Sequence, residues 1–224
     1  MSELAFRTRA AAGEPAGLLL LHHGRGADEN DLLPLAEALD PRRRLHVVLP
    51  RAPLPAGSSA GYRWYEVPQP GRPDAESFAR SYGQLAGLHD ELWDETGIAP
   101  EHTVLGGFSM GAAMSYALGL AAERPAPAGI LAFSGFLPRF ADWTPRPHGS
   151  VRPRAFIAHG SRDQLIDVSH ARDARERLEQ AGVDVEYHES EVAHHVDPRV
   201  IGEAAAWLAT ALPAQLASRR QPNA

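Results

Sequence analysis

The 224-residue sequence contains neither cysteine nor lysine, since all 22 of its basic residues are arginine. The missing cysteine excludes a thiol nucleophile, disulfide bonds, iron–sulfur clusters and zinc sites built on thiolates. The missing lysine excludes a Walker-type phosphate lysine and Schiff-base chemistry. Long apolar runs are absent too, because none approaches the roughly 18 residues that a membrane-spanning helix needs.

Positive charge is scarce, because 28 acidic residues against 22 arginines give a net charge of −6. The longest arginine run, Arg42 to Arg44, is interpreted as a solvated helix–strand junction, so no nucleic-acid partner is expected. Residues Met1 to Arg9 carry Glu3, Arg7 and Arg9 rather than the apolar core of a signal peptide. The cytoplasm is therefore the expected location, and homodimerisation is left open.

Short apolar runs alternate with amphipathic stretches, which is typical of strands that alternate with helices. Most of the runs are continuously apolar, which indicates a parallel sheet buried on both faces. The predicted strands are Leu18 to His22, Leu45 to Leu49, Thr103 to Phe108, Gly129 to Phe133, Ala155 to Ala158 and Val183 to Tyr187, with an edge strand at Leu4 to Thr8.

Apolar residues at steps of three and four predict the helices. The expected helices contain Phe78 to Leu92, Ala112 to Leu118, Val168 to Gln180 and, after the capping pair Asp197-Pro198, Ile201 to Leu212. Gly182 suits the left-handed conformation that ends the third of them. Residues 1–212 are expected to form one domain, and residues 213–224 a polar, frayed tail.

Two stretches rich in proline, glycine and aromatic residues fit neither period: Arg51 to Pro73 and Phe136 to Pro153. We predict that both are ordered loops at the carboxyl ends of strands, where open α/β sheets bind ligands.

The pattern Gly-x-Ser-x-Gly occurs twice, around Ser59 and around Ser109. The first copy lies within a Pro/Gly-rich stretch and is interpreted as a flexible loop. The second lies between a predicted strand and a predicted helix, which is the context of a nucleophile elbow. There the serine is held in a strained conformation at the amino end of a helix, and Gly107 and Gly111 leave room for neighbouring backbone.

A serine nucleophile needs a histidine base and an orienting carboxylate, in the chain order Ser, Asp, His. Asp163 follows a predicted strand directly, whereas Asp167 stands before a predicted helix and suits a capping role. Either His194 or His195 can supply the base, and spacing favours His194 because it lies farther from the final helix.

The loop Leu21 to Asp28 after the first buried strand holds a glycine-flanked turn that can present a backbone N–H. Together with the N–H of Met110, this group would form an oxyanion hole. A dinucleotide-binding fingerprint is disfavoured because Gly24-x-Gly26 lacks its third glycine. A metal site is the other alternative; its ligands would be His22, His23, His159, His194 and His195. Adjacent strand residues point to opposite faces, so His22 and His23 are poorly placed to chelate one ion.

Five segments together resemble the phospholipase/carboxylesterase family of α/β-hydrolases, to which acyl-protein thioesterases belong. These segments are Leu21 to Asp28, Leu105 to Gly111, Ser134 to Pro138, His159 to Asp163 and His194 to Pro198, the last followed by Trp207-Leu208. The resemblance implies an α/β-hydrolase fold: a mainly parallel central sheet with helices on both faces. No separate cap domain is expected, because the interval between Gly135 and Ala155 is short.

Carried over by position, the resemblance implies Ser109 as nucleophile, Asp163 as orienting acid and His194 as base. It also implies the backbone N–H groups of Arg25 and Met110 as the oxyanion hole. The sequence differs from the family at Met110 and Ala193, where the family commonly has Gln and Gly. Because Met110 follows the serine directly, its side chain is expected to change the shape of the substrate pocket.

The expected activity is that of a serine carboxylesterase or thioesterase acting on short- to medium-chain acyl esters or thioesters, with no cofactor and no metal. Aromatic and apolar residues of the two loops, among them Trp64, Phe136 and Leu137, are candidates to line an acyl groove, although they equally suit loop packing. The alternative is a non-catalytic, hydrolase-like binding module, which has no need of a strained serine.

Overall fold

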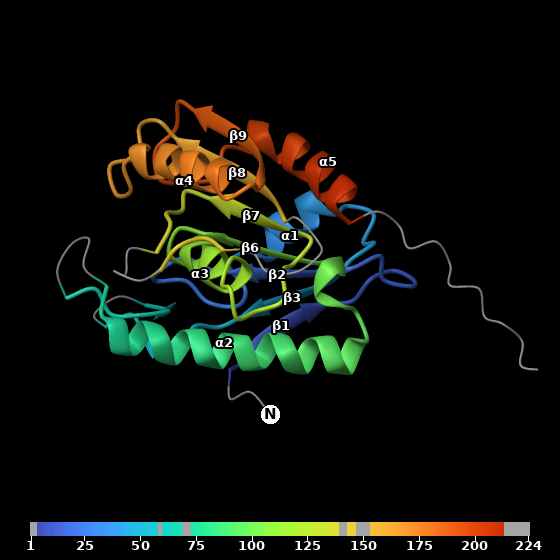
Figure 1. Ribbon diagram of the computed structural model, residues 1–224. Helices are drawn as coiled ribbons and strands as arrows, with labels where there is room; N and C mark the ends of the chain where they lie inside the picture. Colours follow the sequence, from blue (N-terminus) through green and yellow to red (C-terminus); the bar gives the residue numbers. More distant parts are fainter. Residues whose placement is uncertain (1–3, 58–59, 69–72, 139–142, 147–152, 213–224) are drawn as a thin grey trace, which may run out of the picture.

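A computed structural model describes residues 4–57, 60–68, 73–138, 143–146 and 153–212 of the chain (Figure 1). Its strands are β1 (Phe6–Arg9), β2 (Leu18–His22), β3 (His46–Pro50), β4 (Leu54–Pro55), β5 (Tyr62–Arg63), β6 (Thr103–Phe108), β7 (Gly129–Phe133), β8 (Arg154–Gly160) and β9 (Asp184–Ser190). Its α-helices are α1 (Leu33–Leu39), α2 (Ala75–Thr96), α3 (Met110–Gly119), α4 (Ser169–Gln180) and α5 (Ile201–Ala211), and two 3₁₀ turns span Pro100–His102 and Pro198–Val200.

The core of the fold is a seven-stranded sheet in the order β1-β3-β2-β6-β7-β8-β9. All neighbouring strands pair in parallel except β1, which runs antiparallel to β3 at one edge. A mainly parallel sheet is therefore confirmed, and β6, the strand before Ser109, lies in the middle of it.

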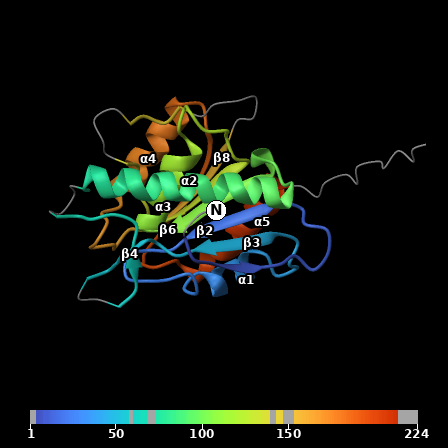
Figure 2. The same cartoon turned by 90° about the horizontal axis from the view of Figure 1, so that it is seen from below.

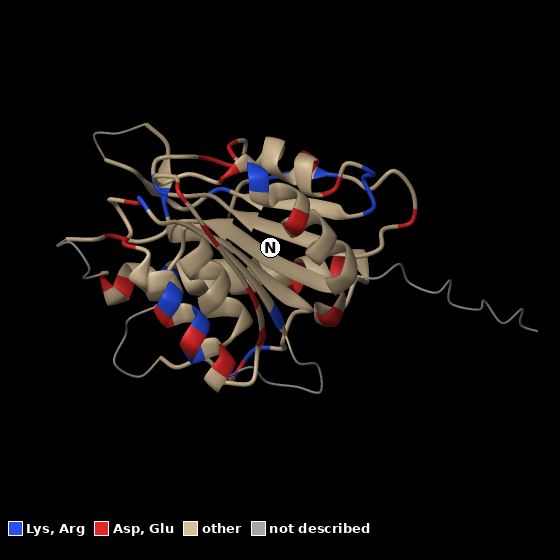
Figure 3. Ribbon diagram, turned by 90° about the horizontal axis from the view of Figure 1, so that it is seen from above, with Lys and Arg blue, Asp and Glu red and all other residues tan. Residues whose placement is uncertain are grey.

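Helices cover both faces of this sheet (Figures 1 and 2). Residues Leu131 and Phe133 of β7 pack in one cluster with side chains of α1 and α5, whereas Ile130 and Ala132 of the same strand pack with α3 and α4. Helix α2 covers the second face beside α3. Because both faces of the inner strands are buried, both side-chain parities are apolar, which explains the continuous apolar runs. Figure 3 shows charged residues mainly on the helices and loops around these inner strands.

All seven predicted sheet strands form, with ends that differ by no more than three residues from those expected. The final helix begins with the 3₁₀ turn Pro198–Val200, and the Asp197 carboxylate accepts a hydrogen bond from the Arg199 N–H. Gly182 has a φ of +80° after α4, as its predicted role requires.

Three features were not predicted: helix α1, the 3₁₀ turn Pro100–His102, and the β4–β5 pair within the loop that begins at Arg51. Among the described residues between β7 and β8, no helix or strand forms. The predicted tail at residues 213–224 lies outside the described residues, as do Ser58 and Ser59 of the first Gly-x-Ser-x-Gly copy.

Candidate active site

Ser109 occupies the sharp turn between β6 and α3. Its backbone has φ 55° and ψ −119°, a region that side chains other than glycine rarely adopt. The Ser109 N–H donates a hydrogen bond of 2.9 Å to the carbonyl of Phe133 at the end of β7, which holds this turn against the neighbouring strand. The hydroxyl therefore projects from the carboxyl end of the sheet.

Gly107 and Gly111 allow the turn to pack this tightly. A Cβ atom on Gly111 would lie 2.0 Å from the carbonyl oxygen of His22 and 2.5 Å from that of His23. One on Gly107 would lie 2.6 Å from the carbonyl carbon of Gly111. Both obstacles are backbone atoms, so the predicted reason for these glycines is confirmed.

His194 bridges Ser109 and Asp163. Its Nε2 lies 3.0 Å from the Ser109 Oγ, and its Nδ1 lies 2.6 Å from Asp163 Oδ2. The Phe108 ring lies against the imidazole, with 4.8 Å between ring centroids. A carboxylate on Nδ1 places the proton there and leaves Nε2 as the acceptor for the serine hydroxyl proton.

The Asp163 side chain is fully buried in the turn after β8. Burial opposes ionisation, but hydrogen bonds from the Ile166 N–H, the His194 ring and the Leu165 N–H outweigh it, so the pKa of Asp163 is below its usual value. The His159 imidazole, near the end of β8, donates from Nε2 to the carbonyl of Ile166 in this turn at 2.8 Å. The carboxylate is thus held ionised and fixed in orientation.

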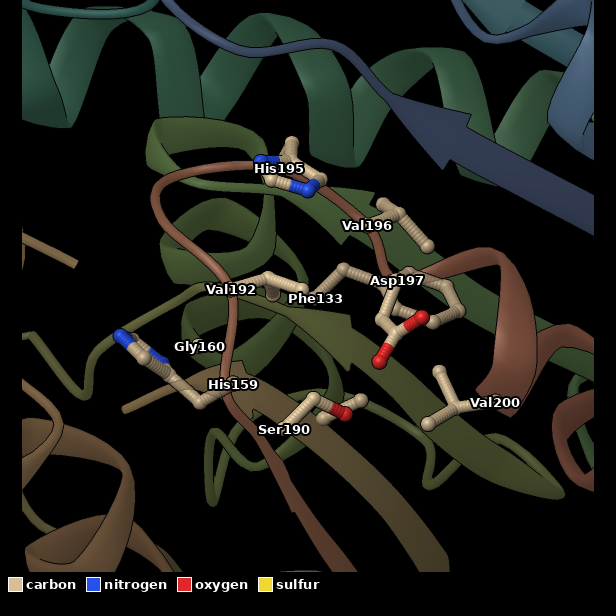
Figure 4. Close-up of a pocket in the computed structure, with 10 residues that line it drawn as sticks. Phe133, His159, Gly160, Ser190, Val192, His195, Val196, Asp197 and Val200 are labelled. Carbon is tan, nitrogen blue, oxygen red and sulfur yellow. The ribbon is translucent and has the colours of Figure 1, made fainter. Parts of the chain in front are cut away.

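The loop after β9 delivers His194, and contacts with the Asp163 turn hold it in place. A Cβ on Gly160 would lie 2.3 Å from the Val192 carbonyl oxygen, and the Arg162 N–H donates to that oxygen at 3.0 Å. The side chains of Ser190 and Asp197 face a void of about 10 Å³ beneath the loop (Figure 4).

The two rejected candidates lie elsewhere. His195 is exposed, and its ring lies at the rim of the void in Figure 4, pointing away from the Asp197 carboxylate. Asp167 accepts a hydrogen bond from the Ser169 N–H at 2.9 Å, which is the helix-capping role predicted for it.

The loop after β2 brings Gly24, the residue before Arg25, to the elbow, since a Cβ on Gly24 would lie 3.0 Å from the Phe108 ring. The His23 ring donates from Nδ1 to the Gly24 carbonyl at 2.7 Å, and its Nε2 accepts from the Ala52 N–H at 3.0 Å. Because Nε2 accepts from a backbone amide, the imidazole is neutral and protonated on Nδ1. The Gly24 carbonyl shares a peptide plane with the Arg25 N–H, so His23 fixes the direction of that donor.

Tyr62 of β5 holds the other side of the same loop. It accepts from the Gly26 N–H and donates to the Ala27 carbonyl, at 2.8 Å in each case. Met110 is the first residue of α3, so its N–H has no intrahelical acceptor. Contacts with Tyr62 and the start of α3 thus hold the two segments that carry the predicted donors, Arg25 and Met110.

The candidate groove residues differ in exposure. Trp64 is fully buried, Leu137 is 2% exposed and Phe136 is half-buried, its ring 6.1 Å from that of His170. Sequence reasoning missed Leu165, which is 75% exposed and follows Asp163 by two residues. A large apolar residue in an otherwise polar turn was the signal available for it.

The five histidines of the metal alternative do not converge. His22 is fully buried, where its ring hydrogen-bonds to Ser115 at 2.8 Å and to His89 at 3.3 Å. Across the described parts of the chain, no group of three or more His, Asp and Glu side chains is arranged to hold a metal ion.

Comparison with known proteins gives a match to one family model. A family model for phospholipases and carboxylesterases matches residues 5–212. The chain belongs to the phospholipase/carboxylesterase family. It is therefore a hydrolase of a family that acts on ester and thioester bonds.

Relatives of this esterase-family chain include the acyl-protein thioesterase 1 of Yarrowia lipolytica, which is 31% identical over 85% of this chain and 89% of its own. The lysophospholipase-like protein 1 of Mus musculus is 28% identical over 74% and 70%. Among solved structures, esterase PE8 superposes with a TM-score of 0.83 at 28% identity, covering 93% of this chain and 99% of its own. A Bacillus cereus carboxylesterase shares the fold, with a TM-score of 0.82 at 24% identity over 94% of this chain and 95% of its own.

Within the described residues, no helix combines the length and apolarity needed to cross a bilayer.

Proposed function

We propose that the protein hydrolyses carboxylic esters or thioesters through an acyl intermediate on Ser109. The observation that carries the proposal is the unbroken hydrogen-bonded chain from the Ser109 Oγ through His194 to Asp163. A buried, ionised carboxylate on one side of the imidazole and a strained serine on the other are the features required of an activated hydroxyl nucleophile.

In the first half-reaction, Ser109 Oγ attacks the carbonyl carbon of the substrate while His194 Nε2 takes the hydroxyl proton. The N–H groups of Arg25 and Met110 then bind the oxyanion of the tetrahedral intermediate, which collapses as His194 gives its proton to the leaving alcohol or thiol. Asp163 remains ionised and stabilises the imidazolium.

In the second half-reaction, His194 takes a proton from water, whose oxygen attacks the acyl-Ser109 carbonyl. The same two N–H groups bind the second oxyanion. Proton transfer from His194 to Ser109 Oγ then releases the carboxylic acid and restores the serine.

The folded protein should react covalently with a fluorophosphonate probe at Ser109, because this probe captures activated serines. Intact-mass spectrometry should show one adduct, and peptide mapping should place it on Ser109. The Ser109→Ala variant should carry none, while Ser161→Ala, which removes an exposed serine from the turn after β8, should label normally. Absence of an adduct on folded wild-type protein would favour a binding module over an enzyme.

We expect activity on uncharged p-nitrophenyl esters to peak at short to medium acyl chains. Phe136 and Leu165 offer apolar surface beside the triad, and each buried methylene contributes at most about 0.8 kcal/mol of binding until that surface ends. Phe136→Ala should raise KM for medium-chain esters more than for acetate. The matched control is Phe6→Ala, which removes an exposed ring on the edge strand β1 and should leave the profile unchanged. A kcat/KM that rises steadily to long-chain esters contradicts this expectation.

A further inference from the structure

Trp64 follows β5 directly and has no exposed surface. All three of its hydrogen-bonding groups have partners within the protein: the indole Nε1–H, the backbone N–H and the backbone carbonyl. The residue therefore offers no polar group to a substrate, and its partners show what it does instead.

The first partner belongs to the loop that carries the Arg25 N–H. The indole Nε1 donates to the His23 carbonyl oxygen at 2.8 Å, and the indole lies against the His23 ring with 5.3 Å between centroids. His23 is the residue whose Nδ1 holds the Gly24 carbonyl, and this carbonyl shares the peptide plane of the Arg25 N–H. Trp64 thus contacts His23, which in turn orients the proposed oxyanion donor, the Arg25 N–H.

The second partner belongs to the elbow. The Trp64 backbone N–H donates to Met110 Sδ at 3.4 Å, and Met110 supplies the other proposed donor with its own N–H. The sulfur is buried and is a weak acceptor, but it is the partner that this buried amide has. Both halves of the proposed oxyanion hole therefore touch the same residue.

The remaining contact anchors Trp64 to the rigid part of the fold. The Ser81 hydroxyl of α2 donates to the Trp64 carbonyl, and the indole and the buried His22 ring are nearly perpendicular, with 5.6 Å between centroids. Trp64 is thereby fixed from α2 and from β2, and it contacts two segments that lie 87 residues apart in the chain, at His23 and Met110.

We infer that Trp64 is a positioning residue that sets the distance between the Arg25 and Met110 N–H groups, and so determines how strongly the protein binds the oxyanion of the transition state. This inference rests on the proposed esterase function. It assigns Trp64 a role through the hole, in place of direct contact with the acyl chain.

The test compares Trp64→Phe, which keeps an aromatic ring but removes the indole N–H, with Met110→Leu, which keeps the side-chain volume but removes the sulfur acceptor. Trp93→Phe is the matched control, because Trp93 donates its indole N–H to Thr103 Oγ1 at the far end of β6. For each protein the measurements are kcat and KM on one p-nitrophenyl ester, the inhibition constant of an alkyl trifluoromethyl ketone, and Tm. The ketone forms a hemiketal whose oxyanion occupies the hole.

Trp64→Phe should lower kcat by about tenfold or more, and Met110→Leu by a smaller factor, with KM changed less than twofold, because the interaction strengthens only in the transition state. The inhibition constant of the ketone should rise by the same factor as kcat/KM falls. Trp93→Phe should lower Tm but leave kcat and the inhibition constant unchanged.

Unchanged kcat and ketone inhibition in Trp64→Phe and Met110→Leu, with an active wild type, would overturn the inference and leave the proposed function standing. A rise in KM with unchanged kcat would also overturn it, because that result indicates contact with the acyl chain. If Trp64→Phe does not fold, Met110→Leu decides between these outcomes. A wild-type protein that neither turns over the ester nor binds the ketone would remove the proposed function, and this inference with it.

Discussion

Replacing His194 by alanine is expected to lower kcat/KM for ester hydrolysis by about three to four orders of magnitude, because the Ser109 hydroxyl then has no base. The imidazole is the link between Ser109 Oγ and the Asp163 carboxylate, at 3.0 and 2.6 Å. Removing it leaves only binding and the oxyanion hole to support a slow residual reaction. Steady-state kinetics on a p-nitrophenyl ester would measure the loss.

The matched control is His195→Ala, which removes the neighbouring, exposed imidazole. Its kcat/KM should stay within about threefold of the wild type, because the hydrogen bonds to Ser109 and Asp163 are made by His194. A large loss of activity in His195→Ala, together with retained activity in His194→Ala, would show that the base is His195 and not His194. Circular dichroism of both variants would exclude unfolding as the cause of any loss.

Acid is expected to destabilise the protein strongly between pH 6.5 and pH 3, because two buried histidines must remain neutral. Burial, with a further contribution from the neighbouring His23, lowers the pKa of His22 from 6.5 to about 3. Burial also lowers the pKa of His89 well below 6.5, and His22 and Arg124 act in the same direction. The two rings stack 5.4 Å apart, so a proton on either would also meet the other.

The sign follows from proton linkage. Below pH 6.5 the unfolded chain binds a proton at each histidine while the folded chain does not, so the free energy of unfolding falls as the pH falls, by up to about 1.4 kcal/mol per pH unit for each histidine. Stability is fully present above the unfolded pKa and is lost progressively toward the folded one. Urea titrations at pH 7, 5.5 and 4 would measure the slope.

His89→Phe should reduce this pH dependence, because the phenyl ring fills similar space and cannot take a proton. Phe6→Ala, which removes an exposed ring on β1 and no histidine, should not change it. A free energy of unfolding that stays constant from pH 7 to pH 4 in the wild type would show that neither buried histidine resists protonation.

The sequence was sufficient for the sheet and for the chain order of the proposed triad. Each of Ser109, Asp163 and His194 follows a strand that an apolar run predicts, and the carboxyl ends of parallel strands meet at one edge of the sheet. Local patterns carry this information most clearly for β6 and β8, because these inner strands are buried on both faces.

The missed elements depend on contacts distant in sequence. Helix α1 has only seven residues and contains Pro34, so its period is too short to detect. The β4–β5 pair joins only two residues on each side, and its position depends on Gly61, where a Cβ would lie 2.2 Å from the Gly26 carbonyl. The burial of Trp64 likewise depends on His23, 41 residues away. Composition identifies an aromatic residue in a loop, but it does not say which surface covers the ring.

The backbone of Ser109 places catalysis and stability under opposing selection. A non-glycine residue at φ 55° and ψ −119° costs about 1–3 kcal/mol, which the surrounding β-sheet and α3 must offset. Glycine would adopt this geometry at lower cost, so selection for thermostability alone favours loss of the proposed nucleophile. The serine at this position is thus required by the proposed activity rather than by stability, and a stabilised Ser109→Gly variant would be a useful inert scaffold for trapping substrates.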